Sequence, residues 1–441
     1  MKWILGTLGL LVLGLLLRLS LLVYAMYVLL GILALTRFFS RAWTDELVAT
    51  RFCDRDVLEI DESAAVEVHV KNEGRLTVPW LLVEDSLPHD ALVLMPLHLK
   101  VDGPRLTLVR LRPGETISLD YRVTFLMRGY YQLGPLLLET GDVFGLHRRF
   151  RVATEPHFAM VLPKVLPLQG YNLASRRPLG EIRVVHRLFE DPTRLAGIRL
   201  YQPGDPLNRI HWRATARTGE IHSRVYENSR VAGATFLLDF HVRSYQGHGA
   251  PASAELAMVT IASLANAVSL MGQQIGLASN GRDAADRIRE EGWGADFITR
   301  REAHRRAKEA LANTRLRPVL VPTRKGDANF TRILETLARL EHTDGLEFSE
   351  MLAEVASEIP RDATVVAVLR RVTPATAAAL GELARRGFLV TVIVVSIELE
   401  PTPDWAQAPD WAQMLLAHDI DFRIVNTEEA VSNLCAEAIV R

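Results

Sequence analysis

The sequence is poor in cysteine and has no excess of charge of either sign. Its 441 residues include only Cys53 and Cys435, which excludes a disulfide framework and a zinc site built from cysteines. There are 51 Lys and Arg residues against 52 Asp and Glu residues, so the strong basic excess typical of nucleic-acid-binding proteins is missing. Hydrophobic residues make up 49% of the chain, which excludes a mainly disordered protein and is enough for two or three folded domains.

Common catalytic motifs are missing as well. The sequence contains no G-x-x-x-x-G-K-[ST] phosphate loop, no G-x-S-x-G nucleophile turn and no H-E-x-x-H zinc motif. Each of these motifs supplies chemistry, namely phosphate binding, a nucleophilic serine or a metal-bound water. The sequence therefore predicts a protein that is not an enzyme and that has no cofactor, and we expect no nucleic-acid partner.

One long apolar run lies near the start of the chain. Residues 3–35 contain a single charged side chain, Arg18. As one helix this run would be about 50 Å long, against roughly 30 Å of bilayer hydrocarbon. Two helices that turn at residues 18–20 would place Arg18 at an interface instead of mid-bilayer, where a charge is costly. We therefore expect transmembrane segments within residues 1–36, preferably a helical hairpin, with one tilted span as the alternative.

Several arginines follow this run, namely Arg37, Arg41, Arg51 and Arg55. Positive residues beside a span are typical of its cytoplasmic end. The two unpaired cysteines agree with a reducing compartment. The sequence therefore predicts a protein of the inner (cytoplasmic) membrane with most of the chain in the cytoplasm.

Strand-like alternation characterises residues 45–160. Apolar side chains occupy every second position in residues 66–70 and 117–125, and turn signals such as Gly134-Pro135 separate the runs. Several short strands at this spacing predict an antiparallel, immunoglobulin-like β-sandwich.

From residue 235 to residue 441, apolar strands alternate with helices. The strands are expected at residues 235–240, 273–279, 318–323, 363–369, 388–395 and 420–425. Continuous apolar strands between helices are typical of a sheet covered on both faces. This region is therefore predicted to be a doubly wound α/β domain with a mostly parallel sheet of about six strands.

Residues 161–234 connect these two domains and are rich in arginine. Between Arg176 and Arg230 there are eleven Arg, no Lys and six Asp or Glu, a local net charge of +5. Pro203-Gly204-Asp205-Pro206 is a turn signal, and the next residues predict a short strand with Ile210 and Trp212 on one side. The residues of interest in this connector are Arg199, Tyr201, Gly204, Asp205, Arg209, Ile210, Trp212, Ala216 and Arg217.

Two interpretations of this stretch remain open. In the structural one, the Asp205 carboxylate pairs with at least one of three arginines, at positions 199, 209 and 217, and Trp212 packs beneath the connector. In the functional one, the arginines form a docking surface for an acidic partner or a phosphate group. We favour the structural interpretation.

The pattern Y-x-x-G-D-x-x-x-x-I-x-W-x-x-x-A-R, which runs from Tyr201 to Arg217, resembles the hallmark of domain of unknown function 58. A second block of that family is similar to RGYYQLGPLLLETGDVFGL at residues 128–146. The resemblance implies a membrane-anchored bacterial protein with a von Willebrand factor A-like domain and a MoxR-type AAA+ ATPase as its partner. Residues 281–317 depart from the family pattern, being longer and more charged, and are expected to form a solvated helical excursion.

A von Willebrand A-like domain raises the question of a metal site. Such sites use D-x-S-x-S after the first strand, because a carboxylate and two hydroxyls suit Mg²⁺. Here Asp239 is present, but His241 and Arg243 take the places of both hydroxyls. We expect a degenerate site that binds no metal, in which Arg243 is a candidate ion-pair partner of Asp239 and Thr323 is the one remaining hydroxyl.

These inferences favour a non-enzymatic, membrane-tethered adaptor or scaffold. It would work with a MoxR-type AAA+ ATPase in the assembly or maturation of other complexes, and other envelope or complex-assembly proteins would be further partners. The alternative is a metal-dependent binder or enzyme that uses Asp239 at the carboxyl edge of the sheet.

Overall fold

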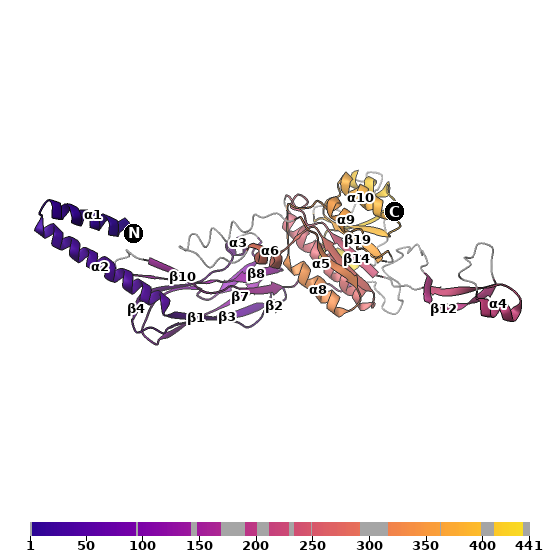
Figure 1. The fold of residues 1–441 in the computed structure, drawn as a ribbon. Helices are drawn as coiled ribbons and strands as arrows, with labels where there is room; N and C mark the ends of the chain where they lie inside the picture. The colour runs from indigo at the N-terminus through magenta and orange to yellow at the C-terminus, as the bar shows by residue number, and fades with distance from the viewer. Residues whose placement is uncertain are drawn as a thin grey trace. The chain divides into compact units, whose positions relative to one another are not determined.

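In the computed structural model, the chain begins with two helices that lie side by side (Figure 1). Helix α1 (Lys2–Leu16) and helix α2 (Ser20–Asp45) are joined by a turn in which Arg18 has a φ of 52°. The predicted turn at Arg18 is therefore confirmed. Helix α2 is long and apolar enough to cross a membrane, whereas α1 is a shorter apolar helix.

The structure describes residues 2–93, 96–142, 148–168, 190–200, 211–228, 233–247, 249–291, 316–361, 363–397 and 410–434. The chain divides into two compact units. The first comprises residues 1–164, 282–314 and 335–341, and the second comprises residues 165–281, 315–334 and 342–441.

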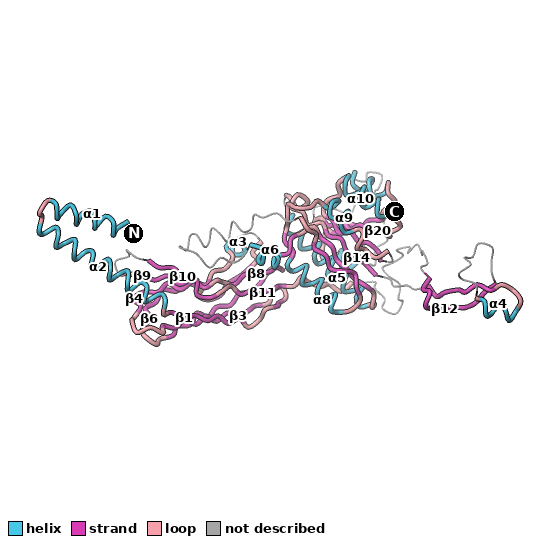
Figure 2. The backbone as a smooth tube through the Cα atoms, in the orientation of Figure 1, coloured by secondary structure: helices cyan, strands magenta, loops and turns pink. Residues whose placement is uncertain are grey.

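Two four-stranded antiparallel sheets form most of the first unit (Figure 2). One has the order β1 (Leu47–Cys53), β3 (Ser63–Asn72), β7 (Thr116–Phe125), β5 (Leu99–Asp102), and the other has the order β10 (Arg148–Thr154), β9 (Leu136–Gly141), β4 (Val78–Asp85), β6 (Leu106–Leu111). Alternate side chains of both sheets share one core, for example Val68, Leu81 and Leu138. The predicted antiparallel sandwich is thus present, because period-2 alternation buries one face of each strand.

A smaller sheet and a short helix complete the sandwich. The sheet consists of β2 (Val57–Leu58), β11 (His157–Val161) and β8 (Gly129–Leu133), and the helix is α3 (His89–Val93). The first unit also contains β16 (Arg282–Asp283), which pairs with β18 (Leu340–Glu341), and helix α6 (Ala284–Glu291). Of the predicted excursion at 281–317, residues 292–315 lie outside the described residues.

A buried ion pair lies inside the sandwich. The Arg51 guanidinium binds the Asp85 carboxylate, with 3.1 Å between Nε and Oδ2, and it also donates to the Leu133 carbonyl oxygen at 3.1 Å. The Tyr121 hydroxyl donates to Asp85 Oδ2 at 2.7 Å. Arg51 therefore serves the core of the sandwich, a role that the sequence did not indicate, and the predicted orientation of the membrane segment stays a prediction.

The second unit is built around a six-stranded sheet. Its order is β17 (Val319–Arg324), β15 (Gln274–Ser279), β14 (Gly233–Leu238), β19 (Ala363–Leu369), β20 (Val390–Val395), β21 (Asp421–Val425). All neighbours are parallel except β17, which is antiparallel to β15. The prediction of about six mostly parallel strands is confirmed, and Phe236 lies on a central strand as expected.

Helices cover both faces of this sheet (Figure 1). Helices α9 (Phe348–Val355), α10 (Pro374–Arg385) and α11 (Asp410–Leu416) share a core with Leu237, Val365 and Val392. Helix α5 (Ala250–Leu270) contacts four of the strands, and α12 (Glu428–Asn433) packs against it. Although α5 is apolar enough to cross a membrane, 78% of its apolar window is buried, so it is a core helix. Residues 327–334 of helix α8 (Asp327–Arg339) are assigned to this unit and residues 335–339 to the first.

The connector contains a two-stranded ribbon and a short helix. Strand β12 (Glu190–Leu200) pairs antiparallel with β13 (His222–Asn228), and helix α4 (Trp212–Thr218) lies between them in sequence. The short strand predicted around Trp212 was therefore wrong. The His211 ring accepts a hydrogen bond from the Ala214 amide at 3.0 Å and so caps a helix, and Gly219 ends it in a left-handed conformation.

Candidate functional site

The carboxyl ends of β14 and β19 mark the point where the strand order reverses. From β14 the chain proceeds outward through β15, whereas β19 leads outward through β20 in the opposite direction. Ligands of open α/β sheets bind outside the carboxyl ends of strands at such a point. Asp239 directly follows β14, and Arg370 directly follows β19, so these two residues define the candidate site.

Asp239 is buried and accepts three hydrogen bonds. Only 3% of this residue is exposed to solvent. Oδ1 accepts from Asn280 Nδ2 at 2.9 Å and from the His241 amide at 3.2 Å, while Oδ2 accepts from the Ser244 hydroxyl at 2.5 Å. Both carboxylate oxygens therefore accept from donors of the protein itself.

Burial raises the pKa of the Asp239 carboxyl above its ordinary value, because the charged form loses its hydration. The hydrogen bonds from Ser244, Asn280 and the His241 amide oppose this rise in pKa. The charge of the neighbouring His241 opposes it as well, and the described residues include no Lys or Arg ion pair to Asp239.

Arg243 does not pair with Asp239, contrary to expectation. Its guanidinium extends to Glu347, with 3.2 Å between Nη1 and Oε1, and both side chains are exposed. The Arg243 amide instead donates to His241 Nδ1 at 3.1 Å, which fixes the ring of this buried histidine. His241 and Arg243, which stand where D-x-S-x-S has its two serines, thus stabilise the loop after β14.

Thr323 cannot complete a metal site. It lies in β17, and its hydroxyl is 2.8 Å from the hydroxyl of Thr235 in β14. Because β17 is antiparallel to β15, residue 324 pairs with Ile275 near the beginning of that strand. Thr323 therefore lies near the amino edge of the parallel strands, on the opposite edge from Asp239.

The donors around Asp239 do not fit a divalent cation. Asn280 Oδ1 accepts from the Phe240 amide at 2.6 Å, which turns its NH₂ group toward the carboxylate. A cation at this point would face N–H hydrogens instead of the oxygen ligands that Mg²⁺ requires. Within the described ranges there is also no group of three His, Cys, Asp or Glu residues that would hold a metal ion.

Arg370 connects the two sides of the reversal point. Its Nη1 donates to the carbonyl oxygens of Gln246 at 2.7 Å and Ser244 at 3.3 Å, and its guanidinium lies 5.9 Å from the centre of the Tyr245 ring. The end of β19 is thereby joined to the loop after β14.

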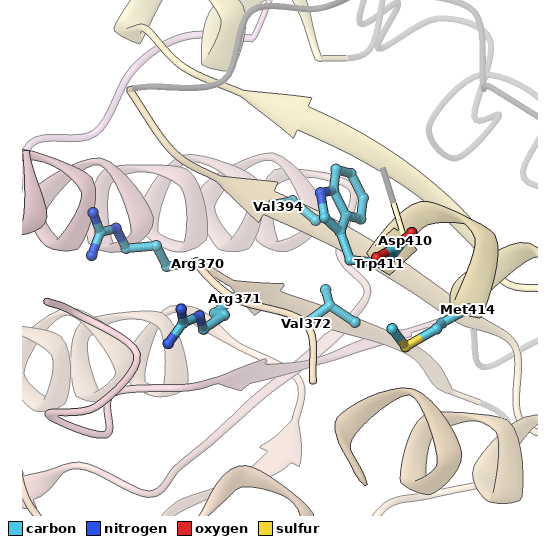
Figure 3. Close-up of a pocket in the computed structure, with 7 residues that line it drawn as sticks. All are labelled: Arg370, Arg371, Val372, Val394, Asp410, Trp411 and Met414. Carbon is cyan, nitrogen blue, oxygen red and sulfur yellow. The ribbon is translucent and has the colours of Figure 1, made fainter. Parts of the chain in front are cut away.

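A pocket of about 460 Å³ adjoins this arginine (Figure 3). Its lining comes from the loop after β19, from β20 and from α11, and consists of Arg370, Arg371, Val372, Val394, Asp410, Trp411 and Met414. Figure 3 shows the two guanidinium groups on one side of Val372, with Trp411 and Met414 on the other. The pocket therefore has a basic end, whereas its other end combines the apolar side chains of Trp411 and Met414 with the Asp410 carboxylate.

The connector residues lie elsewhere in the second unit. Arg199 lies in β12, and Trp212, Ala216 and Arg217 lie in α4. Trp212 is 68% exposed, so the expectation that it is buried was wrong. The remaining residues of interest lie outside the described residues, and with them the predicted ion pair of Asp205: Tyr201, Gly204, Asp205, Arg209 and Ile210.

The first residue of the 128–146 block has a structural contact in the first unit. The buried Arg128 guanidinium donates to the carbonyl oxygens of Leu337 at 2.7 Å and Leu340 at 3.2 Å. Leu337 lies in the last turn of α8 and Leu340 directly follows the helix, at an end where a cation is favourable. Sequence reasoning missed this role, and it also missed Ser244 and Asn280. Asn280 directly follows β15, so its position at the carboxyl edge was the available signal.

Comparison with known proteins places part of this chain near a family without an assigned function. The family described as "Protein of unknown function DUF58" matches residues 197–294. The uncharacterized protein YeaD of Bacillus subtilis (strain 168) is 24% identical over 239 residues, which cover 53% of this chain and 56% of that protein. The match thus spans about half the length of this curated relative.

Solved structures match the chain only loosely. The CARDB domain of the PF1109 protein from Pyrococcus furiosus is 20% identical, with 26% of this chain and 87% of that chain covered and a TM-score of 0.18. The ASH/PapD-like domain of human CEP192 is 10% identical, with 26% and 83% covered and a TM-score of 0.18. Because these scores are low, the fold rests on the strand pairing described above. The chain is therefore similar over residues 197–294 to the DUF58 family, whose function is unknown.

Proposed function

We propose that this protein is a membrane-tethered adaptor without catalytic activity. In this proposal the second unit is a von Willebrand A-like domain that binds a MoxR-type AAA+ ATPase, and the ATPase supplies the ATP hydrolysis for assembly or maturation of other complexes. Helix α2 is the principal membrane tether, and both folded units lie in the cytoplasm.

The hydrogen bonding of Asp239 is the observation that carries this proposal. A carboxylate that serves as a metal ligand or a general base must offer a lone pair to its target. Three of the roughly four lone-pair sites of the Asp239 carboxylate are instead directed to Ser244, Asn280 and the His241 amide. The acidic group at the reversal point thus supports the loop, which favours a binding role for this edge over a chemical one.

The pocket beside Arg370 supports the same role. Arg371 lines it, is exposed, and has no ion-pair partner within the part of the chain that the structure describes. Trp411 and Met414 provide apolar surface a short distance away. Aromatic side chains and arginine together are typical of protein–protein contacts, in which a few such residues supply most of the binding energy.

Co-purification tests this proposal. The full chain with a tag after Arg441 would be expressed with the MoxR-type ATPase of the same genome, solubilised in detergent and purified. We expect the ATPase to remain bound through size-exclusion chromatography, and an ATPase that elutes alone would contradict the proposal.

Metal analysis of the same preparation provides the second test. A stoichiometric divalent metal in the wild-type protein that is lost in Asp239→Asn would instead support the metal-dependent alternative.

A further inference from the structure

The exposed face of α4 has the properties of a binding surface. We propose that Trp212, Arg213 and Arg217, together with Ile221 after the helix, dock onto a partner protein whose surface offers an apolar pocket edged by carboxylates. We name these four residues the α4 surface. This inference rests on the proposed function, because it assigns to the adaptor a surface through which it holds its partner.

The apolar part of the α4 surface is open to solvent. Trp212 is 68% exposed and Ile221 is 48% exposed, and α4 contains no buried residue. Burial of this tryptophan in a partner's pocket would remove its apolar surface from water, and tryptophan is one of the residue types enriched in binding hot spots. The burial that stabilises other helices of this protein is therefore missing from α4.

The charged part of the α4 surface is positive. Arg213 and Arg217 are four residues apart on the helix, so their side chains are neighbours. Both are exposed, and neither forms an ion pair among the residues that the structure describes. They are two of the eleven arginines that give residues 176–230 their net charge of +5. A complementary partner surface is acidic.

Hydrogen bonds hold the α4 surface in one conformation. The His211 ring caps the amino end of the helix at Ala214, the Gly219 amide donates to the Thr215 carbonyl at 2.9 Å, and the His222 amide donates to the Thr215 hydroxyl at 3.1 Å. The indole is thus displayed on a backbone that is fixed at both ends. Binding by such a surface loses less conformational entropy than binding by a flexible loop.

The composition of this segment favours a protein partner over a membrane surface. Lipid-binding segments use clusters of about four to eight Lys or Arg residues. Residues 211–222 contain only Arg213 and Arg217, and Glu220 opposes them. One tryptophan followed by two arginines on the same short helix is instead typical of protein interfaces, in which both residue types are enriched.

The test measures binding of the full chain, reconstituted in nanodiscs, to the purified MoxR-type ATPase. We expect Trp212→Ala to weaken binding by at least about 30-fold, as for a hot-spot residue. The double variant Arg213→Glu/Arg217→Glu should also weaken binding, and more strongly at low than at high salt. The melting temperature should remain unchanged in both variants, because α4 buries none of its residues.

Matched controls come from other exposed positions of the same unit. Leu270→Ala removes an apolar side chain that is 63% exposed, and Arg385→Glu/Arg386→Glu reverses two exposed charges at the carboxyl end of α10. We expect less than about twofold change in affinity from each, as for residues outside a hot spot.

Each contrary outcome is distinguishable. A wild-type chain that does not bind the ATPase would overturn the proposed function and this inference with it. Wild-type binding that Trp212→Ala leaves unchanged would overturn this inference alone. The same holds if Trp212→Ala abolishes self-association of the chain, or abolishes its binding to vesicles that contain anionic lipid, while ATPase binding persists.

Discussion

The two best-defined buried carboxylates of this protein are stabilised in different ways. Asp85 in the sandwich is neutralised by Arg51 and also accepts from the Tyr121 hydroxyl, whereas Asp239 in the sheet is held by neutral donors. Burial, with Asp85 beside it, raises the pKa of the Tyr121 hydroxyl, which therefore stays protonated and continues to donate. The difference determines how each residue responds to substitution and to pH.

Substitution of Asp85 by alanine is expected to destabilise the first unit by about 3–5 kcal/mol, because it leaves the buried charge of Arg51 without a partner. The pair is almost completely enclosed, with 4% of the Arg51 side chain and none of the Asp85 side chain exposed. The matched control is Arg55→Ala, which breaks a 3.2 Å pair with Glu62 at the surface and should cost at most about 1 kcal/mol. Denaturant unfolding of the full chain in detergent measures both values, and equal losses would contradict the prediction.

For Asp239, unlike Asp85, we expect that removal of the charge alone does not lower the free energy of unfolding. Asparagine retains an oxygen that accepts from Asn280 and the His241 amide, and its NH₂ group can donate to the Ser244 hydroxyl. Asp239→Asn should therefore be at least as stable as the wild type at neutral pH. Asp239→Ala leaves donors unsatisfied and should lower the free energy of unfolding by about 1–3 kcal/mol.

The pH dependence of this difference has a definite sign. Because the pKa of Asp239 is raised on folding, the folded state keeps the proton over a pH range in which the unfolded state has lost it. The wild-type free energy of unfolding therefore falls, relative to Asp239→Asn, as pH rises above about 4. Unfolding of both proteins between pH 4 and 8 measures this. A wild type that gains stability over the variant with rising pH would show that Asp239 is stabilised by charge.

At the scale of single residues, the sequence located Asp239 but not its partners. A buried strand that ends in Asp239 is visible in the hydrophobic pattern, and so is its place at the carboxyl edge. Ser244 and Asn280 are brought to that carboxylate by a loop and by a neighbouring strand, which no local pattern encodes. The same reason explains why the sequence did not indicate the role of Arg51 in the core of the sandwich.

At the scale of elements, the spacing of apolar residues along the sequence predicted the sandwich strands and the parallel strands well. It was wrong at Trp212 because three alternating residues cannot distinguish a strand from the first turn of a helix. The N-cap at His211 and the left-handed C-cap at Gly219 favour the helix over a strand. The antiparallel direction of β17 was also not visible, because strand direction follows from the connections between strands and not from composition.

One arginine determines the end of the candidate membrane helix α2. Arg151 Nη1, from β10, donates to the carbonyl oxygens of Thr44 at 3.0 Å and Leu47 at 3.2 Å. Arg151→Ala should therefore loosen the end of α2, because these carbonyls lose their donor and the helix terminus loses a cation, together about 1 kcal/mol. Hydrogen exchange of peptides that cover residues 40–50 should become about fivefold faster. Arg148→Ala, on the same strand but with 68% of its side chain exposed, should leave exchange unchanged.

At the scale of the whole molecule, a helical hairpin and a single span place Arg18 at different depths in the membrane. Helix α2 is 26 residues long and begins directly after the turn at Arg18, which separates it from α1. If both helices cross the bilayer, this turn reaches the outer surface, and the two folded units lie in the cytoplasm together. If residues 3–35 form one tilted span instead, Arg18 is within the hydrocarbon and reaches neither surface.

Cysteine labelling separates these arrangements. In a chain with Cys53 and Cys435 replaced by serine, we expect Arg18→Cys to react with a membrane-impermeant maleimide added to intact spheroplasts. Lys100→Cys, at a sandwich position whose side chain is 65% exposed, should react only after the membrane is permeabilised. Protection of Arg18→Cys on both sides would favour the single span. Reaction of Lys100→Cys in intact spheroplasts would place the sandwich outside the cytoplasm, and a cytoplasmic ATPase would then have no access to it.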